Sequence, residues 1–400
     1  MKRKPKLVCH STRWRGRPAI ALSNGAITLE WLLGGGHLAS VVAHSANGES
    51  PNFLWEAPWK TIEPYEYSTK KHSRLYSPPP QGSYLAGYTG HVLCLDYFGN
   101  PSKEETKLGL PLHGELASQR WIAKEKKISR GTARVVMQAK APVARLTFER
   151  EVVIHEGEPV AYLTETVTNE QKMDRFIQWT QHTTFGPPFL REGESVCVMP
   201  AARCRTWPHG YEGKPALADD KDFSWPLAPS HSGGQHDISK PFVEKGRGFV
   251  ATVLLEASSP VAYVAVLNWK VNRVFGYCFR KADYPWVAIW EENCARADVP
   301  WKGTTQARGL EFGTTPTPVG MRESVFAGPL FGVPRLICIP AAGRRTIPYV
   351  MFSAEVPSSW RAVSKIEARG GKIILMESAG APRVELPARS VDELLEPAQR

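Results

Sequence analysis

The sequence AYLTETVTNEQKMDRFIQWTQHTTFGPPFL, residues 161–190, decides the fold class. Apolar and polar side chains alternate on both sides of a polar stretch, 169–174, which is typical of two β-strands joined by a turn. On the second strand, alternation places Gln178 and His182 on one face and Trp179 on the other. We therefore expect an antiparallel hairpin whose polar face lines a cleft.

The same period of two recurs along the chain, between turns rich in Gly, Pro, Asn and Asp. Many short strands separated by turns indicate a β-sandwich or barrel, so the expected fold class is all-β. The pattern allows only short helices, near 321–326 and 390–395. The expected strands are 26–32, 133–139, 144–154, 161–168, 175–184, 248–255, 262–269, 286–290, 308–312, 349–355 and 372–376.

Two long stretches, 52–90 and 207–246, lack clear periodicity and are expected to be loops. Loops of this length in a compact domain are usually functional or disordered, and their many aromatic side chains favour ordered, packed loops. The sequence shows no internal repeat. We therefore expect one domain over 1–400, with its core at about 20–356 and terminal strands and a polar tail at 357–400.

The chain has 400 residues, 42% of them hydrophobic and 22% charged, which is typical of a globular protein with ample material for a core. The formal net charge of +11 raises the question of a nucleic-acid partner, since basic surfaces attract phosphate. The basic residues are scattered, however, and no nucleic-acid-binding motif is present. We therefore expect a solvated basic surface and no nucleic-acid partner.

The seven cysteines are widely spaced and form no CxxC pair. This pattern argues against a disulfide scaffold or a zinc ribbon, and it predicts reduced, mostly buried thiols. The basic N-terminus is not followed by an apolar run of signal-peptide length, and no stretch reaches the roughly eighteen apolar residues of a membrane span. We therefore expect a cytoplasmic protein that does not cross a membrane.

Three motifs elsewhere in the chain resemble those of the galactose mutarotase family, the aldose 1-epimerases. In that family a strand ending in TNxG precedes an HxYFN histidine motif, an HGxxR segment contacts the sugar, and a later strand carries a glutamate. The Tyr and Asn of HxYFN are absent here, and Arg120 lies further from its histidine than in the family. The matching segments are LPLHGE at 110–115 followed by Arg120-Trp121, TNE at 168–170 followed by HTTFG at 182–186, and ARGLEFG at 307–313.

The resemblance covers about 24–355 and implies a large antiparallel β-supersandwich with few short helices. It also implies that Glu311 is the general base and His182 the general acid of sugar mutarotation. That reaction needs a base for the anomeric hydroxyl and an acid for the ring oxygen, and a carboxylate and an imidazole suit both tasks. Alternation places Glu311 beside the small Gly309, which leaves room for a ligand. The expected partner is a small sugar or sugar derivative, with no cofactor and no metal.

The expected sugar contacts come partly from the resemblance and partly from alternation. The resemblance implies that His113 and Arg120 touch the sugar. Alternation places Tyr284, Trp286 and Trp290 on one face, where indole rings could stack on a sugar. The expected sugar-binding residues are His113, Arg120, Gln178, Trp286 and Trp290.

Two other functions fit the same cleft, namely a non-catalytic carbohydrate-binding protein and a polysaccharide lyase or glycosidase. The absent Tyr and Asn favour the first, and a glycosidase needs a second carboxylate facing Glu311. Glu311 could also simply pair with a neighbour such as Arg308. His231, His236 and Asp237 on a Gly-rich loop carry metal-ligating atoms, but not in a known metal-binding spacing.

Overall fold

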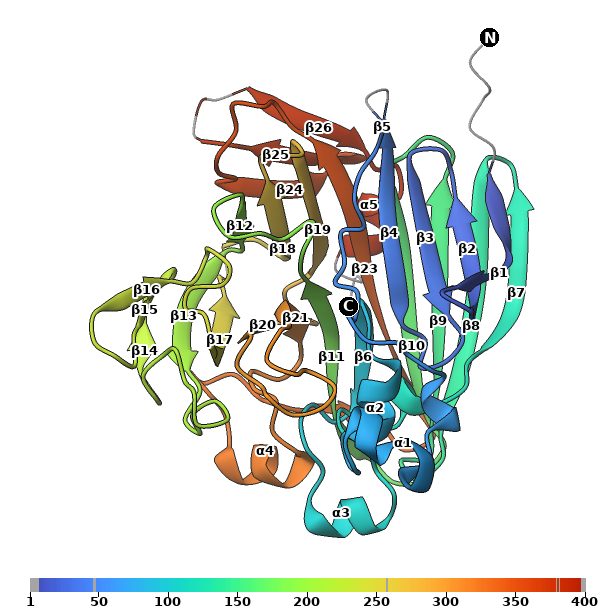
Figure 1. The fold of residues 1–400 in the computed structure, drawn as a ribbon. Helices are drawn as coiled ribbons and strands as arrows, with labels where there is room; N and C mark the ends of the chain where they lie inside the picture. Colours follow the sequence, from blue (N-terminus) through green and yellow to red (C-terminus); the bar gives the residue numbers. More distant parts are fainter. Residues whose placement is uncertain (1–6, 46–47, 257, 379, 381, 397–400) are drawn as a thin grey trace.

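The computed structural model describes residues 7–45, 48–256, 258–378, 380 and 382–396, and two large antiparallel sheets form the body of the molecule (Figure 1). The first sheet has 13 strands. Its order is β1 (Val8–Trp14), β2 (Arg17–Ser23), β3 (Ile27–Leu32), β4 (Leu38–Ser45), β6 (His91–Asp96), β11 (Arg175–Phe185), β21 (Gln306–Gly313), β20 (Trp286–Asn293), β17 (Arg247–Leu255), β13 (Ala201–Thr206) and β14 (Asp222–Phe223), with β5 (Gly48–Glu49) beside β4 and β22 (Ile337–Ile339) beside β11.

The second sheet has eight strands, and two small sheets accompany the large ones. The order of the second sheet is β12 (Ser195–Val198), β18 (Val261–Asn268), β19 (Arg273–Arg280), β23 (Arg344–Glu355), β10 (Val160–Asn169), β9 (Leu146–His155), β8 (Thr132–Ala141) and β7 (Ile122–Ser129). The small sheets are β15 (Leu227–Pro229) with β16 (Gln235–Asp237), and β24 (Lys365–Arg369), β25 (Lys372–Met376) and β26 (Arg383–Pro387). The helices in the described residues are η1 (Pro64–Glu66), α1 (Thr69–Tyr76), α2 (Gly82–Gly87), α3 (Lys103–Lys107), η2 (Leu116–Ser118), α4 (Met321–Ala327) and α5 (Val391–Leu395).

Three apolar clusters hold these layers together. The largest lies between the two large sheets and includes Trp179 of β11 and Phe312 of β21. A second cluster joins the outer face of the eight-stranded sheet to the C-terminal segment, with Trp360 and the strands β24 to β26. A third, rich in Trp and Tyr, covers the outer face of the 13-stranded sheet. The two large sheets therefore bury apolar side chains on both faces, and the third cluster marks the face that carries the candidate site.

The all-β prediction is confirmed, and each expected strand coincides with an observed one. The short helices expected at 321–326 and 390–395 are also present as α4 and α5. All seven cysteines are free, and four of them are buried. In the described part of the chain, no helix is both long enough and apolar enough to cross a membrane.

The expected hairpin at 161–184 is wrong, because its two strands belong to different sheets. β10 pairs with β9 and β23, whereas β11 pairs with β6 and β21. The connection crosses the sandwich and is held by Asn169, whose amide nitrogen donates to the backbone oxygens of Met173 (2.8 Å) and Ile339 (3.2 Å). Alternation shows which face of a strand is buried, but it does not show which strand pairs with it.

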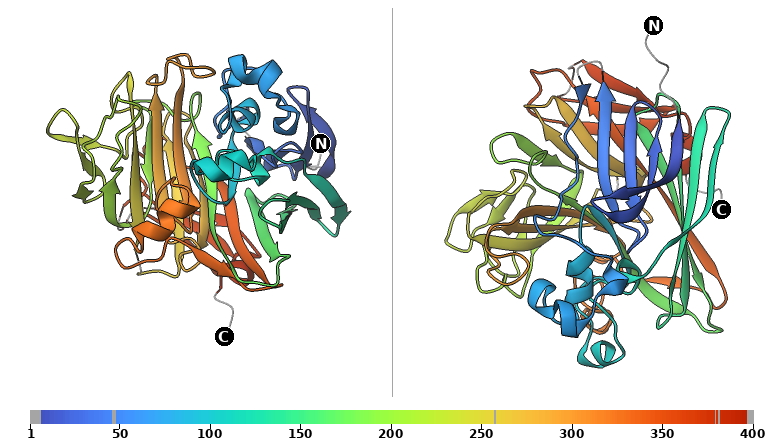
Figure 2. Two further views of the ribbon diagram at one scale, coloured as in Figure 1. Left: turned by 90° about the horizontal axis from the view of Figure 1, so that it is seen from below. Right: turned by 45° about the vertical axis from the view of Figure 1, so that its right-hand side comes forward.

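The stretch expected to be a loop at 52–90 contains two helices that the sequence pattern missed. The helices α1 and α2 pack on the outer face of the 13-stranded sheet, and Figure 2 shows them gathered with α3 and α4 at the lower end of the molecule. Their many aromatic side chains are packed, as expected. The stretch 207–246 has only the short strands β14, β15 and β16.

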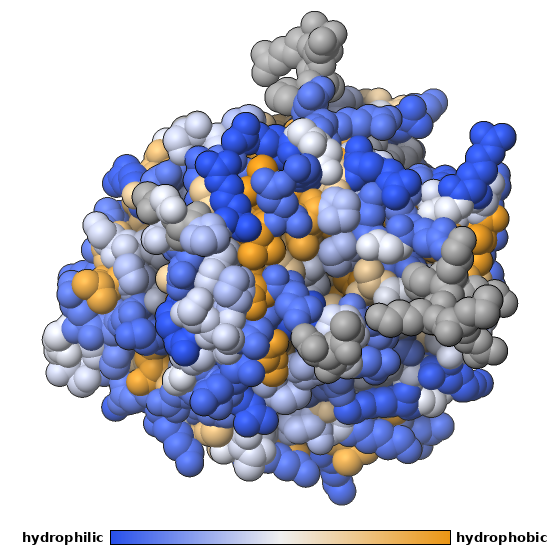
Figure 3. Space-filling view, turned by 90° about the horizontal axis from the view of Figure 1, so that it is seen from above, coloured by the Kyte–Doolittle hydropathy of each residue, from blue (hydrophilic) through white to orange (hydrophobic). Residues whose placement is uncertain are grey.

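On the upper face, at the end of the molecule opposite the helices α1 to α4, hydrophilic residues predominate and hydrophobic ones show in small groups (Figure 3).

A buried polar network connects the two large sheets. The guanidinium of Arg150 on β9 donates to Glu165 Oε1 on β10 at 2.6 Å, and both side chains are fully buried. From β11, Gln181 donates to Glu165 Oε2 at 2.6 Å, and the Trp179 indole donates to the same atom at 3.2 Å. The Tyr349 hydroxyl donates to Glu165 Oε1 at 3.1 Å. With four donors on one carboxylate, the cost of burying its charge is offset by charge-assisted hydrogen bonds.

We predict that Glu165→Gln lowers the free energy of unfolding by about 3–5 kcal/mol, because it leaves the Arg150 charge buried without its partner. The matched control is Glu385→Gln, which removes a cross-strand ion pair with Lys372 that is half exposed. An exposed pair contributes about 1 kcal/mol or less. Urea denaturation monitored by tryptophan fluorescence measures both values, and equal losses in the two variants would refute the role of the network.

Candidate active site

The register between β11 and β21 brings the two expected catalytic residues together. Thr180 pairs with Gly313 and Thr184 with Gly309, so His182 lies directly opposite Glu311. Side chains that face each other on adjacent antiparallel strands point to the same side of the sheet. Here that side is the outer face of the 13-stranded sheet, away from the sandwich interior.

His182 and Glu311 form a buried pair. His182 Nε2 lies 3.1 Å from Glu311 Oε1, and the side chains are 6% and 2% exposed. The angle does not suit a hydrogen bond, and Glu311 Oε1 has no hydrogen-bond partner. A Cβ at Gly309 would lie 2.1 Å from that oxygen, so only glycine leaves room for the carboxylate. The result is a buried acceptor that is free to bind a ligand hydroxyl.

Burial controls the protonation of both groups. It raises the pKa of the Glu311 carboxyl well above its ordinary value, because a buried charge loses its hydration. It lowers the pKa of His182 to about 3, so the imidazole is neutral near pH 7. An ionised Glu311 is therefore an unusually basic carboxylate, and it stands beside a neutral imidazole.

A chain of hydroxyl groups orients the His182 ring. Its Nδ1 lies 3.2 Å from Thr184 Oγ1, and that oxygen lies 2.6 Å from the Tyr88 hydroxyl. When Tyr88 donates to Thr184 and Thr184 donates to Nδ1, the imidazole proton is on Nε2. In this tautomer the nitrogen near the Glu311 carboxylate, Nε2, carries a proton, and the lone pair of the ring is on Nδ1.

His113 reaches the same place from a turn after α3. Its Nδ1 accepts a hydrogen bond from the Gly99 backbone N–H at 3.0 Å, so the neutral ring carries its proton on Nε2. Burial lowers the pKa of His113 well below its usual range, and the charges of His182 and Arg296 lower it further. The ring centroids of His113 and His182 are 5.2 Å apart. His113 therefore presents a fixed, neutral N–H donor to the site.

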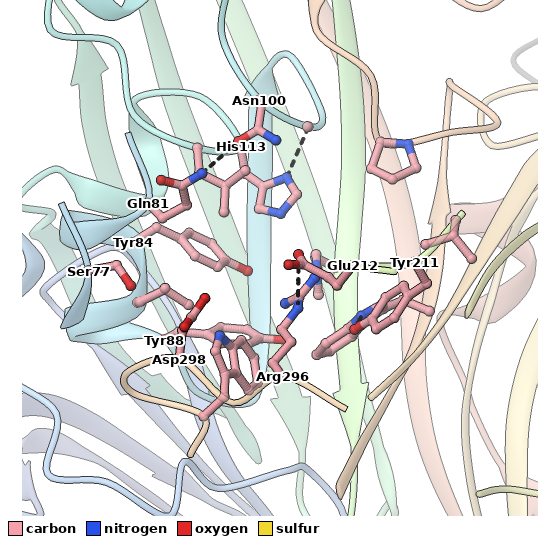
Figure 4. Close-up of a pocket in the computed structure, with 18 of the residues that line it drawn as sticks. Ser77, Gln81, Tyr84, Tyr88, Asn100, His113, Tyr211, Glu212, Arg296 and Asp298 are labelled. Atoms are coloured by element: carbon pink, nitrogen blue, oxygen red, sulfur yellow. Dashed lines mark hydrogen bonds and ion pairs between the residues drawn. The ribbon is translucent and has the colours of Figure 1, made fainter. Parts of the chain in front are cut away.

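These residues form the floor of a cavity of about 500 Å³ (Figure 4). One wall comes from the segment that contains α1 and α2, and the other comes from the loops 207–212 and 296–301. Aromatic rings and a few polar groups dominate the lining, which is typical of small-molecule sites. The lining includes Ser77, Gln81, Tyr84, Tyr88, His113, His182, Trp207, Tyr211, Glu212, Trp290, Arg296, Asp298, Trp301 and Glu311.

Arg296 brings a positive charge into this cavity. Its guanidinium carbon lies 5.1 Å from the ring centroids of Tyr211 and Trp301, within the range of a cation–π interaction. Its Nε lies 3.4 Å from a Glu212 oxygen and 3.7 Å from a Glu292 oxygen. Figure 4 shows Arg296 and Glu212 meeting inside the lining. The terminal nitrogens therefore remain able to donate to a ligand oxygen.

Solved structures with similar architecture have been described as mutarotase-like proteins or as candidate mutarotases. A galactose mutarotase-like protein from Clostridium acetobutylicum aligns with a TM-score of 0.57 and 13% identity, over 88% of this chain and 99% of that one. A candidate aldose 1-epimerase from Klebsiella pneumoniae gives 0.60 and 14%, over 86% and 81%. A candidate mutarotase from Salmonella typhimurium gives 0.54 and 12%, over 87% and 94%. This chain has the galactose mutarotase-like fold.

The comparisons support the fold and leave the chemistry to be argued from the site. No protein-family model and no curated protein sequence matches this chain. At identities of 12–14%, structural similarity shows how the chain folds, and one fold can support several activities. The function of this chain therefore has to be argued from the residues in the cavity.

Of the expected site residues, the structure brings His113, His182, Trp290 and Glu311 together in the cavity. The Trp290 indole N–H donates to the Tyr211 hydroxyl at 2.8 Å, which fixes the ring as part of the wall. Most other aromatic and polar residues of the lining were not among the expected site residues. They include Tyr88, Arg296 and Trp301, of which Tyr88 belongs to the aromatic-rich stretch 52–90.

The other three expected sugar contacts lie outside the cavity lining. Arg120 is exposed, with its guanidinium carbon 6.0 Å from the Tyr65 ring centroid. Gln178 is buried, and its amide bonds the Phe98 N–H and the Val319 carbonyl. The Trp286 indole donates to the Pro334 carbonyl at 3.3 Å. Neighbouring segments cover the ends of these strands. A strand face therefore reaches the cavity only near the middle of the strand.

Two further expectations about neighbouring residues need correction. Tyr284 does not share a face with Trp290, because it precedes β20 and packs in the sandwich interior, where Gln181 donates to its hydroxyl. Arg308 points to the interior and pairs with Glu291 instead of Glu311. Glu311 is therefore not part of a structural ion pair with Arg308.

The residues considered for a metal site are separated in the structure. His231 is exposed, His236 lies 3.5 Å from a Glu244 oxygen, and one Asp237 oxygen accepts from the Ser239 hydroxyl at 2.5 Å. In the described residues, no three His, Cys, Asp or Glu side chains gather in a way that could hold a metal ion.

We predict that Glu311→Gln stabilises the protein at pH 7 by about 1 kcal/mol or more, because it removes a buried charge that lacks a partner. The raised pKa of Glu311 sets the sign. At low pH Glu311 is protonated in the parent protein, which removes the cost of its buried charge, and this cost returns as the pH rises. The unfolding free energies of the parent and of Glu311→Gln should therefore converge towards pH 4. Thermal unfolding from pH 4 to 8 measures the difference.

The matched control is Glu291→Gln on the neighbouring strand. Glu291 is also buried, but it accepts hydrogen bonds from the backbone N–H groups of Phe242 (2.6 Å) and Val243 (3.0 Å) and pairs with Arg308. Removing this partnered charge should destabilise the protein by about 3–5 kcal/mol. If both variants were destabilised equally, Glu311 would be a structural carboxylate.

Proposed function

We propose that this protein is an aldose 1-epimerase, which interconverts the anomers of a sugar with Glu311 as general base and His182 as general acid. One observation carries the proposal, namely the buried cross-strand pair of His182 and Glu311 at the floor of a cavity of about 500 Å³. A cavity of this size, lined by aromatic rings with a few inward polar groups, can hold a small sugar.

The proposed reaction uses the protonation states that burial sets. The Glu311 carboxylate accepts the proton of the anomeric hydroxyl while the neutral His182 transfers its Nε2 proton to the ring oxygen, and the bond between the anomeric carbon and the ring oxygen breaks. His182 is then an imidazolate, with Nδ1 at 3.2 Å from the Thr184 hydroxyl, which can donate to it. The open-chain aldehyde rotates by half a turn about the adjacent C–C bond. The proton transfers then reverse, the ring closes on the other face of the carbonyl, and both side chains return to their starting states.

The surroundings support each role. The raised pKa of Glu311 strengthens the base, since a general base is most effective when its pKa approaches the working pH. His113 offers its Nε2–H, and Arg296 its terminal N–H groups, to hydroxyl oxygens of the sugar. The hydroxyl chain through Tyr88 and Thr184 can donate to Nδ1 of His182, which is the arrangement that leaves the proton on Nε2.

We predict that Glu311→Gln and His182→Ala each reduce kcat by about 10²- to 10⁴-fold, the usual contribution of a positioned acid or base. Exchange NMR spectroscopy on free aldoses, with uncatalysed mutarotation subtracted, measures the rate. Arg120→Ala is the control, because its exposed side chain lies outside the cavity, and it should keep the parent rate within about twofold. Undiminished anomer exchange in either active-site variant would refute the assignment.

The pH profile provides an independent check. We predict that kcat/KM falls on the acid side with an apparent pKa above the ordinary glutamate value of about 4.3, because Glu311 must be ionised and burial raises its pKa. His182, with a pKa of about 3, adds no second limb near neutral pH. Initial rates between pH 4 and 9 test this, and an acid limb at or below pH 4.3 would contradict a buried carboxylate base.

A glycosidase is the second candidate, and one observation favours it. Glu212 and Asp298 also line the cavity, so further carboxylates are available beside Glu311. Glu212, however, is half exposed and already pairs with Arg296. Incubation with oligosaccharides separates the candidates, because a glycosidase releases new reducing ends, a lyase forms unsaturated sugars, and a purely binding protein changes neither the anomers nor the chain length.

A further inference from the structure

A second hollow of about 510 Å³ adjoins the candidate active site at the lower end of the molecule. The two cavities share Asn100, Trp207 and Pro318 in their linings. The second one lies between the start of α3 and the helix α4, which Figure 2 shows near each other. The two cavities therefore adjoin at these three residues.

The second hollow carries groups suited to a sugar ring. Phe326 on α4 lines it and is 79% exposed, while the half-buried Trp207 forms the junction with the active site. The guanidinium carbon of Arg322 lies 5.9 Å from the Phe326 ring centroid. In the described residues Arg322 forms no ion pair, so its donors are available to hydroxyl groups. Glu105 also lines the hollow, and one of its oxygens accepts from the Ser102 N–H at 2.7 Å.

The position of α4 is fixed by contacts to the sheet and to the opposite loop. The amide of Gln178, on the same strand as His182, donates to the Ser324 hydroxyl. Across the hollow, His209 Nε2 lies 3.1 Å from a Glu323 oxygen, which links the loop that carries Trp207 to α4. These contacts hold α4 in place, so the hollow is present without any movement of α4.

Size argues for a ligand longer than one sugar ring. Each cavity alone lies within the range of roughly 300–1,000 Å³ that encloses a drug-sized ligand. A single hexose is smaller than such a ligand. A monosaccharide at Glu311 therefore leaves the second hollow, with its exposed Phe326 ring, unoccupied.

We propose that the substrate is a reducing oligosaccharide whose terminal unit binds at Glu311 and whose next unit binds between Trp207 and Phe326. This inference rests on the proposed function, because anomer exchange requires a free anomeric hydroxyl in the inner cavity. The next unit must then be attached through another hydroxyl of the terminal sugar. The outer unit stacks on aromatic rings, and Arg322 and Glu105 bond its hydroxyls.

The test compares monosaccharides with reducing disaccharides, using glucose and galactose against maltose, cellobiose and lactose. We expect at least one disaccharide to show a kcat/KM for anomer exchange about tenfold above that of its reducing-end monosaccharide. Phe326→Ala should lower kcat/KM for that disaccharide by about three- to tenfold, the usual effect of one aromatic contact, and leave the monosaccharide unchanged.

The matched control is Val325→Ala, which alters the adjacent residue of α4. Val325 is 56% exposed and lines neither cavity, so both substrates should retain the parent rates. If monosaccharides exchange as well as every disaccharide and Phe326→Ala affects neither, the second subsite is refuted while the epimerase proposal stands. If no sugar exchanges, the epimerase proposal fails, and saturation-transfer NMR decides the subsite. If a disaccharide binds and Phe326→Ala weakens its binding, the second subsite is supported. If no disaccharide binds, or Phe326→Ala leaves its binding unaltered, the second subsite is overturned.

Discussion

The register of β11 against β21 is the constraint on which the candidate site depends. Side chains alternate along both strands, so Trp179 and Gln181 enter the sandwich interior while His182 faces outward, opposite Glu311. A slip of one residue would exchange these faces. The bonds from Trp179 and Gln181 to Glu165 of the other sheet oppose such a slip, because it would leave a buried carboxylate without its donors. The structural network thus fixes the geometry of the site.

Glu165 and Glu311 show how one sheet supports both stability and chemistry. Glu165 accepts four hydrogen bonds and is compensated, whereas Glu311 Oε1 lies buried without a partner. An unsatisfied buried acceptor costs stability unless a ligand supplies the missing donor. On the proposed function, the sugar supplies the hydrogen-bond partner that Glu311 lacks in the protein.

Periodicity in the sequence was enough to predict the strands that carry His182 and Glu311 and the faces of these two residues, because burial on one side enforces a period of two. It missed other strands of the same sheets, such as β4, β6 and β19. It did not predict the partner sheet of β10, since strand pairing depends on contacts that are distant in sequence. Periodicity also did not exclude Gln178 and Trp286 from the expected sugar contacts. Both lie on strand faces near the site but are covered by other segments. The Ser102 and Glu105 capping box of α3 was a readable signal that strand periodicity alone overlooks.

The departures from the mutarotase motifs are matched by groups that arrive from other parts of the chain. Thr184 stands where the HxYFN motif has its Tyr, and the Tyr88 phenol reaches that position and lies 2.6 Å from the Thr184 hydroxyl. Gly186 stands at the Asn position, where a Cβ would lie 2.4 Å from the Trp55 ring. Arg120 lies outside the cavity, and Arg296 brings a guanidinium into it from a different loop. On the proposed function, a phenol and a guanidinium therefore reach the cavity from parts of the chain that lie outside the motifs, because a site needs its groups close in space and not in a fixed order along the chain.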